Sequence, residues 1–343
     1  MRAWQDWLRR NVWILHLVYL FVAVVFAFHF ASQRWTMKGE WDEIPIEQIV
    51  AGKAQTPFQY RMLIPWMLGL ADRFFLPLPG IAGLRTLAFV VEFVFIFAVV
   101  AMFRLYMREY IRRPIACTLL SLTVILVLPY NFSPINMWGF WLVYDMPSVF
   151  FMILGLLLIR RRLWLLYYPV FMLATFNRET TCLLTMIYVL VAWDKERPRR
   201  IAAHVLAQFV IWVAIKAALF AAYRDNPGPG IGWNALTANL AIFFDKPRLF
   251  FGFLSSLGFL WLPVFVLYPF IPDRFVRRAV LIGPVHLLFM IATGNIPEVR
   301  IYGEMIPVFL PGYLLLLQQF SSESPMVSRD PPVESRSPGS YPA

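Results

Sequence analysis

The chain has 343 residues, of which 60% are apolar and only 15% are charged, and its mean hydropathy is +0.63. Soluble domains average about a quarter charged residues, so this composition indicates a polytopic membrane protein. The formal net charge of +11 does not indicate a nucleic-acid partner. The basic residues fall in short loops between apolar segments, which is the distribution that sets membrane orientation.

Apolar stretches recur along the chain and predict an all-α, polytopic transmembrane helix bundle with about ten spans, several of them short. The first stretch follows a basic segment, is about long enough to span a bilayer and lacks a good small-residue cleavage site. We therefore expect a retained first helix rather than a signal peptide. The stretches lie at approximately 12–31, 83–103, 114–130, 143–159, 163–176, 180–193, 201–222, 250–270, 279–293 and 305–319.

Basic residues mark alternate connections between these stretches, and by the positive-inside rule those connections and both termini are expected to be cytoplasmic. The basic connections contain Arg9-Arg10, Arg104 to Arg113, Arg160 to Arg162, Lys195 to Arg200 and Arg274 to Arg278.

The sequence predicts one membrane-embedded domain over residues 1–320, with two external loops at 32–82 and 223–249. Within the first loop, the stretch from Arg61 to Phe75 is apolar but carries charges, which predicts an interfacial helix. Residues 321–343 are rich in Ser, Pro and charge and are expected to form a disordered cytoplasmic tail.

The segment 163–193 is informative because both of its ends carry basic residues. As one helix it would be about 46 Å long, well beyond a hydrocarbon core of ~30 Å. It must therefore turn in the middle, at Asn177-Arg178-Glu179. Each arm is roughly 21 Å long, so the turn should lie recessed in the outer leaflet. Charges there are tolerated when they are paired or face a water-filled cavity, and we expect a cavity.

Charged clusters far apart in the sequence all fall on this external side, which suggests one site. Asp145 has no compensating charge nearby in sequence and needs a partner from another helix or water. The alternatives are solvated loop acids, a snorkelling Arg61, a structural pair at the hairpin tip and a solvated entry to the last helix. The candidate binding residues are Tyr60, Arg61, Asp145, Asn177, Arg178, Glu179, Glu298, Arg300, Tyr302 and Glu304.

Recessed arginines suit a phosphate attached to a lipid tail. Asp42 and Glu43, in the first external loop, could accept a proton from an acceptor hydroxyl or hold a divalent cation such as Mg²⁺ or Mn²⁺. The sequence has no P-loop and no nucleophile elbow. Its histidines and its two cysteines lack metal-ligand spacing, so a metal site cannot be assigned from them.

The plan of a first helix, a long external loop with Trp41-Asp42-Glu43 and then many short spans resembles the GT-C superfamily of membrane glycosyltransferases. The resemblance spans most of residues 1–320 and extends to a group of bacterial membrane proteins of that plan. The stretches that carry it are Pro57 to Pro65, Tyr144-Asp145-Met146-Pro147, Phe176 to Thr180 and Glu298 to Tyr302.

This resemblance implies an inverting glycosyltransferase of the bacterial inner membrane that takes sugar from a polyprenyl-phosphate donor at the periplasmic face. Asp42 would be the catalytic base, with Glu43 its neighbour or alternate. The acceptor would be a glycan, lipid or protein. No large periplasmic domain follows the last apolar stretch, so acceptor recognition is expected to fall to the two external loops. A transporter or flippase, or a polymerase or ligase, of lipid-linked saccharides is the alternative.

Overall fold

The computed structural model describes residues 11–37, 45–74, 81–132, 142–228, 235–245, 253–296 and 298–322. All regular secondary structure within these ranges is helical, as predicted. Asp42, Glu43 and the tail from residue 323 onward lie outside the described residues.

Six helical segments of the described chain are long and apolar enough to cross a membrane. This finding supports a multi-pass membrane protein, but the predicted number of about ten spans is not confirmed. The six segments are Val12–Thr36, Gly83–Met107, Pro114–Phe132, Pro198–Ala222, Arg274–Thr293 and Val299–Ser321.

The other predicted spans are shorter or broken helices. The stretch predicted at 250–270 contains three short pieces in its described part, η3 (Ser256–Phe259), α14 (Trp261–Val266) and η4 (Tyr268–Phe270). The backbone turns there because Leu257, Gly258 and Phe259 all have positive φ. The remaining elements are α3 (Ile46–Val50), η1 (Phe58–Tyr60), α4 (Leu63–Phe74), α6 (Pro114–Ser121), α7 (Val124–Phe132), α12 (Leu236–Asp245), α15 (Arg274–Ala279), α16 (Ile282–Thr293) and α17 (Ile306–Ser322).

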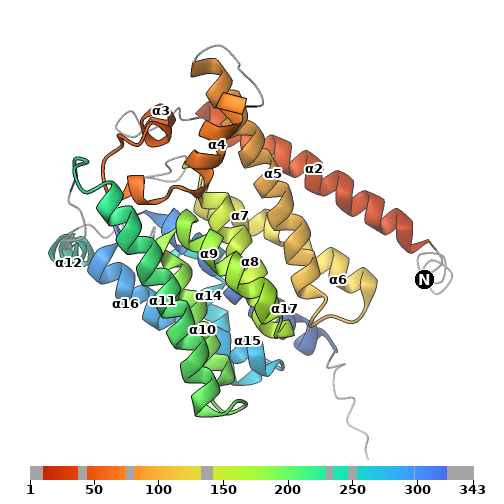
Figure 1. The fold of residues 1–343 in the computed structure, drawn as a ribbon. Coiled ribbons are helices and arrows are strands. Elements are labelled where there is room, and N and C mark those ends of the chain that lie inside the picture. Colours follow the sequence, from red (N-terminus) through yellow and green to blue (C-terminus); the bar gives the residue numbers. More distant parts are fainter. Residues whose placement is uncertain are drawn as a thin grey trace, which may run out of the picture.

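Helix α8 (Asp145–Arg161) is the central helix of the bundle. Its residues are apolar on every side and almost all of them are buried, as expected for a helix without a solvent face. Helix α5 (Ile81–Met107) packs between α8 and α2 (Val12–Met37), which lies along the outer edge (Figure 1). The first residue of α8 is Asp145, so the fold places this carboxylate at one end of the core.

The predicted turn within 163–193 is confirmed. Helix α9 (Trp164–Asn177) ends where Arg178 adopts an extended backbone, with φ −159° and ψ 146°. The short η2 (Glu179–Thr181) then leads into α10 (Cys182–Ala192). The indole of Trp212, in α11 (Pro198–Ala222), donates to the carbonyl of Glu179 at 2.9 Å and fixes the turn against its neighbour.

The two predicted external loops meet at the end of the bundle that carries α3 and α4, at the top of Figure 1. Asn226 donates from Nδ2 to the carbonyls of Gly52 at 3.0 Å and Ala54 at 2.8 Å. The Thr56 N–H donates to the Pro227 carbonyl at 2.7 Å. These contacts fasten the first loop to the second.

Candidate functional site

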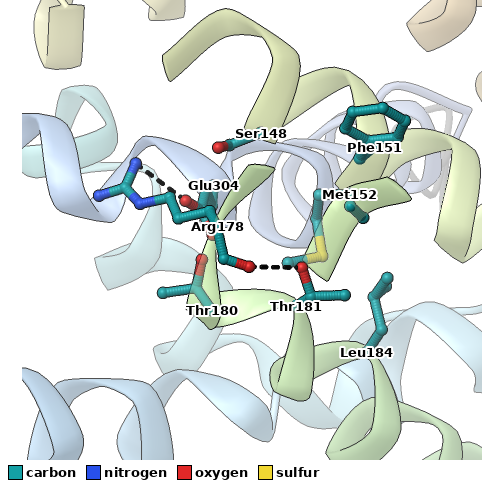
Figure 2. A pocket seen from close by; sticks show the side chains of 9 residues that line it. Ser148, Phe151, Met152, Arg178, Thr180, Thr181, Leu184 and Glu304 are labelled. Atoms are coloured by element: carbon teal, nitrogen blue, oxygen red, sulfur yellow. Dashed lines mark hydrogen bonds and ion pairs between the residues drawn. The ribbon is translucent and has the colours of Figure 1, made fainter. Parts of the chain in front are cut away.

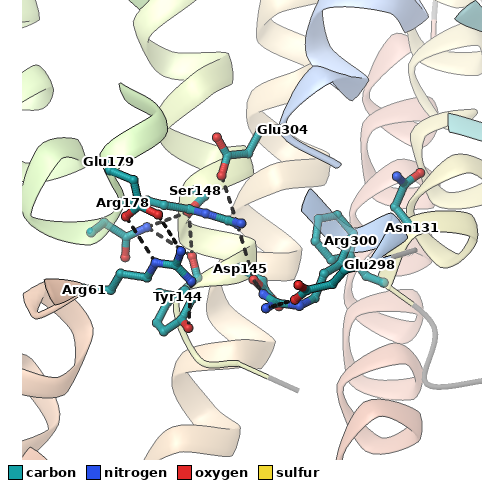
Figure 3. A network of polar contacts seen from close by, with 12 residues as sticks. Arg61, Asn131, Tyr144, Asp145, Ser148, Arg178, Glu179, Glu298, Arg300 and Glu304 are labelled. Atoms are coloured by element: carbon teal, nitrogen blue, oxygen red, sulfur yellow. Dashed lines mark hydrogen bonds and ion pairs between the residues drawn. The ribbon is translucent and has the colours of Figure 1, made fainter. Parts of the chain in front are cut away.

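Asp145 is the centre of a buried charge network (Figure 3). Its side chain is fully buried, and its Oδ1 contacts Nη1 of Arg300 at 2.8 Å and Nη1 of Arg178 at 3.5 Å. Its Oδ2 lies 3.5 Å from Nη2 of Arg34. The partners that this lone acid required therefore come from three separate segments, α2, the α9–η2 turn and η5 (Val299–Met305).

Each of these arginines has a second carboxylate partner. Arg34 Nε lies 2.7 Å from Glu92 Oε1, inside α5, and both side chains are 1% exposed. Arg178 Nη1 lies 2.9 Å from Glu304 Oε1, and Arg300 pairs with Glu298. Because acids and bases alternate through the network, the buried charges compensate one another locally.

Arg61 extends the network toward α4. Its Nε donates to Glu179 Oε2 at 3.2 Å and its Nη1 donates to the Tyr144 hydroxyl at 3.0 Å. The guanidinium carbon also lies 4.9 Å from the centre of the Tyr144 ring. Burial lowers the pKa of Arg61, but Glu179 and Tyr144 outweigh this effect and raise the pKa well above its ordinary value. Arg61 therefore stays charged at any pH that the protein meets.

Asn177 and Asn131 hold the backbone around the network. Asn177 donates from Nδ2 to Ser148 Oγ at 2.8 Å and to the Tyr144 carbonyl at 3.1 Å, which fixes the start of α8. Asn131 donates to the Val299 carbonyl at 2.9 Å and fixes the start of η5. Asn177, predicted as a binding residue, is thus placed to position Asp145.

Two of the predicted binding residues are tyrosines that lie outside the ion pairs. The Tyr60 ring packs edge-on against Phe220 at 4.4 Å in an apolar cluster. The Tyr302 ring, two residues after Arg300, packs against Phe253 and His286. The buried Tyr302 hydroxyl has no hydrogen-bond partner among the described residues, so it keeps a free donor.

Sequence reasoning missed three charged residues of this region. Arg34 was assigned to the first external loop, but α2 continues to Met37 and Arg34 is 1% exposed in its last turns. Glu92 is the one acid within the predicted span 83–103, a signal that the sequence did contain. Lys216 in α11 is 3% exposed, and its ammonium has no hydrogen-bond partner in the described part of the chain. It lies within electrostatic reach of Glu179.

The network is formally neutral. Five cations face five acids, so the formal sum is +5 − 5 = 0. These residues are Arg34, Arg61, Arg178, Arg300 and Lys216 on one side and Glu92, Asp145, Glu179, Glu298 and Glu304 on the other.

A small pocket opens at the edge of the network (Figure 2). Arg178, Glu304 and Ser148 contribute polar atoms, and Thr180 and Thr181 lie beside them. Its volume is about 10 Å³, room for about one water molecule and far below the ~300–1,000 Å³ of typical ligand sites. This pocket is much smaller than the water-filled cavity that the sequence predicted at the turn. Mutual pairing of acids and arginines makes the buried charges tolerable without bulk water.

The described residues contain no group of three or more His, Cys, Asp or Glu side chains arranged to hold a metal ion. Each acid of the network is occupied by an arginine, which leaves little room for a cation there. Asp42 and Glu43, the acids predicted to hold a divalent cation, lie outside the described residues, so that expectation stays a prediction.

The comparisons with known proteins add no relative. No protein-family model matches the chain, and no curated protein or solved structure matches it. The function is therefore inferred from the residues and their geometry.

Proposed function

We propose that this protein is a membrane glycosyltransferase that transfers sugar from a polyprenyl-phosphate donor to an acceptor at the periplasmic face of a bacterial inner membrane. The observation that supports this proposal most is the gathering of Arg34, Arg178 and Arg300 around the buried Asp145. The resemblance to the GT-C plan supplies the donor class and the catalytic acid.

A purely structural role explains this network poorly. Buried ion pairs rarely stabilise a protein more than well-packed apolar residues of the same volume. Ionisable side chains inside membrane proteins generally mark substrate paths, because their cost is otherwise hard to offset. Here the charged side chains around Asp145 come from α2, α5, the α9–η2 turn and η5, and they meet near the start of α8.

The arginines keep free donors with which to bind a phosphate. Arg178 Nε and Arg300 Nε have no hydrogen-bond partner among the described residues, and the free Tyr302 hydroxyl follows Arg300 in η5. A guanidinium presents five N–H donors in a fork that matches phosphate oxygens. These groups form the best candidate site for the donor phosphate.

Because the network is neutral, an incoming phosphate must displace a carboxylate. Glu179 and Glu298 are best placed to leave, since their side chains are 34% and 14% exposed while Asp145 is fully buried. Release of Glu298 frees Arg300, and release of Glu179 frees Arg61. The closed network thus opens when the donor binds.

The proposed transfer step combines this phosphate site with the catalytic acid that the resemblance implies. The Asp42 carboxylate takes the proton of the acceptor hydroxyl, whose oxygen attacks the anomeric carbon of the sugar. The bond from that carbon to the phosphate oxygen breaks, and polyprenyl phosphate leaves with the electron pair. Arg178 and Arg300 stabilise the charge that develops on the leaving phosphate. Asp42 is the fifth residue after Met37, the end of α2, and so lies at most about 18 Å from it.

Proteoliposomes loaded with radiolabelled polyprenyl-phosphate sugars test the proposal. We expect sugar transfer by the wild type and a loss of roughly 10²–10⁴-fold for Asp42→Asn, the usual contribution of a general base. Glu47→Gln, which changes a partly exposed, paired acid in α3, serves as the control. Full transfer by a normally folded Asp42→Asn, with no further loss in Asp42→Asn/Glu43→Gln, would exclude the assigned base.

The closed, neutral network also suits a transporter, because ion pairs that break and re-form are a common gate. A flippase would move the lipid-linked saccharide across the proteoliposome membrane and release no polyprenyl phosphate. A polymerase or ligase would lose activity when Arg178 or Arg300 is changed but keep it in Asp42→Asn. The same proteoliposomes distinguish these alternatives.

A further inference from the structure

A second, larger pocket lies at the opposite end of α8. The helix has 17 residues, which places its last residue about 25 Å from Asp145. Arg160 and Arg162 line the pocket at the end of α8, Lys195 and Glu196 line it after α10, and Phe275 of α15 closes one side. Its volume is about 330 Å³, at the lower end of the ~300–1,000 Å³ of typical ligand sites.

Two of its three basic residues have spare binding capacity. Arg160 is already paired, since its two Nη atoms lie 3.2 and 2.8 Å from the carboxylate of Asp273. Arg162 is 55% exposed and lies 3.8 Å from Glu196, a long ion pair. The Lys195 side chain has no partner that the described residues supply. The pocket can therefore accept an anion without breaking a short pair.

The acid in this pocket is already held in place. Glu196 is 6% exposed, and its Oε2 accepts from the Tyr188 hydroxyl at 3.0 Å. The same oxygen lies 3.4 Å from Nε of Arg200. Glu196 therefore faces Tyr188 and Arg200, and Arg162 and Lys195 supply the net positive charge of the opening.

Exposed apolar side chains lie close in sequence to the pocket residues Arg162 and Lys195. Leu165 is 92% exposed, Leu166 is 58% exposed and Trp193 is 71% exposed. They follow Arg162 or precede Lys195 within a few residues. A tryptophan at this level is typical of the boundary between headgroups and acyl chains. A ligand that fits both the basic pocket and these apolar side chains carries a phosphate next to hydrocarbon chains.

We infer that this pocket binds the phosphate headgroup of an acidic membrane lipid. Arg162 and Lys195 take the phosphate, and Leu165, Leu166 and Trp193 contact the acyl chains. Basic pockets between transmembrane helices on the cytoplasmic side bind anionic headgroups by this combination of contacts. This site is separate from the charge network and does not depend on the proposed transferase activity.

Native mass spectrometry of the full-length protein in detergent, with phosphatidylglycerol or phosphatidylcholine added, tests the inference. We expect the wild type to retain phosphatidylglycerol in preference to phosphatidylcholine. Arg162→Ala/Lys195→Ala should weaken that retention roughly thirtyfold, the factor for losing two cations near an anionic lipid. Arg112→Ala/Arg113→Ala, which removes two exposed cations after α5, is the matched control and should change retention less than threefold.

Two results would overturn the inference. Equal retention of phosphatidylglycerol by the wild type and Arg162→Ala/Lys195→Ala would show that these two residues do not form a lipid site. Displacement of the retained lipid by millimolar inorganic phosphate would show that the pocket selects a free phosphate rather than a headgroup. Both changed residues are exposed, so we expect the variant to fold. An unfolding temperature equal to that of the wild type in phosphatidylcholine checks this.

Discussion

The substitution Asp145→Asn tests whether the charge network behaves as one coupled unit. Asn has the size and shape of Asp, so the packing at the start of α8 is preserved. The formal balance changes from +5 − 5 to +5 − 4, and one uncompensated positive charge remains buried. Arg300 loses the anion 2.8 Å from its Nη1, and Arg34 and Arg178 each lose a contact at 3.5 Å.

The expected loss of stability follows from the burial of these groups. Removing one partner of a buried ion pair costs about 3–5 kcal/mol, since the other charge stays desolvated. The double variant Asp145→Asn/Arg300→Gln removes one charge of each sign and should recover part of that loss. We expect a coupling free energy of about 1.5–3 kcal/mol between the two positions.

Unfolding in mixed micelles of detergent and dodecyl sulfate measures these free energies. Glu47→Gln is the matched control, because Glu47 forms a 3.1 Å pair with Arg85 on a surface where both side chains are partly exposed. This control should lose less than about 1 kcal/mol. If Asp145→Asn also lost less than about 1 kcal/mol, the coupled network would be refuted. Strictly additive losses of stability in the double variant would refute it as well.

Gly303→Ala, with Gly312→Ala as its control, and Asn226→Ala test the elements that hold the site. Gly303→Ala should lower the free energy of unfolding by about 1–3 kcal/mol, because the new Cβ would lie 2.1 Å from the Phe132 ring. Gly312→Ala, where the nearest atom lies 3.5 Å away, should be neutral or slightly stabilising in the same unfolding assay. Asn226→Ala should lower stability by about 1–3 kcal/mol and speed proteolysis of the first external loop, since two loop carbonyls lose their donor. Unchanged cleavage of that loop would contradict the proposed fastening of the two loops.

Chain length and charge placement predicted the turn at Arg178 well. The segment 163–193 was too long for one span, and both of its ends were basic, so the turn could lie only near its middle. Similar reasoning identified Asp145 as a residue that needed distant partners. Both arguments use constraints that act locally along the chain, which is why the sequence sufficed.

The partners of Asp145 could not be read from the sequence. Arg34 is 111 residues away, and Arg300 is 155 residues away. Arg34 was assigned to a loop because the apolar run ends near residue 31, although the helix continues to Met37. Apolar composition likewise predicted a span over 250–270. There Leu257 donates its N–H to Asn131 Oδ1 at 3.0 Å, a tertiary contact in a turn that composition does not encode.

The dissociation constant of polyprenyl phosphate for the purified protein tests the central claim most directly. Arg300→Lys keeps the positive charge but loses the forked donors, so the account predicts binding about tenfold weaker or worse than that of the wild type. Arg85→Lys, at the exposed pair with Glu47, should bind as the wild type does. Equal affinity of a folded Arg300→Lys and the wild type would contradict a phosphate site at this network.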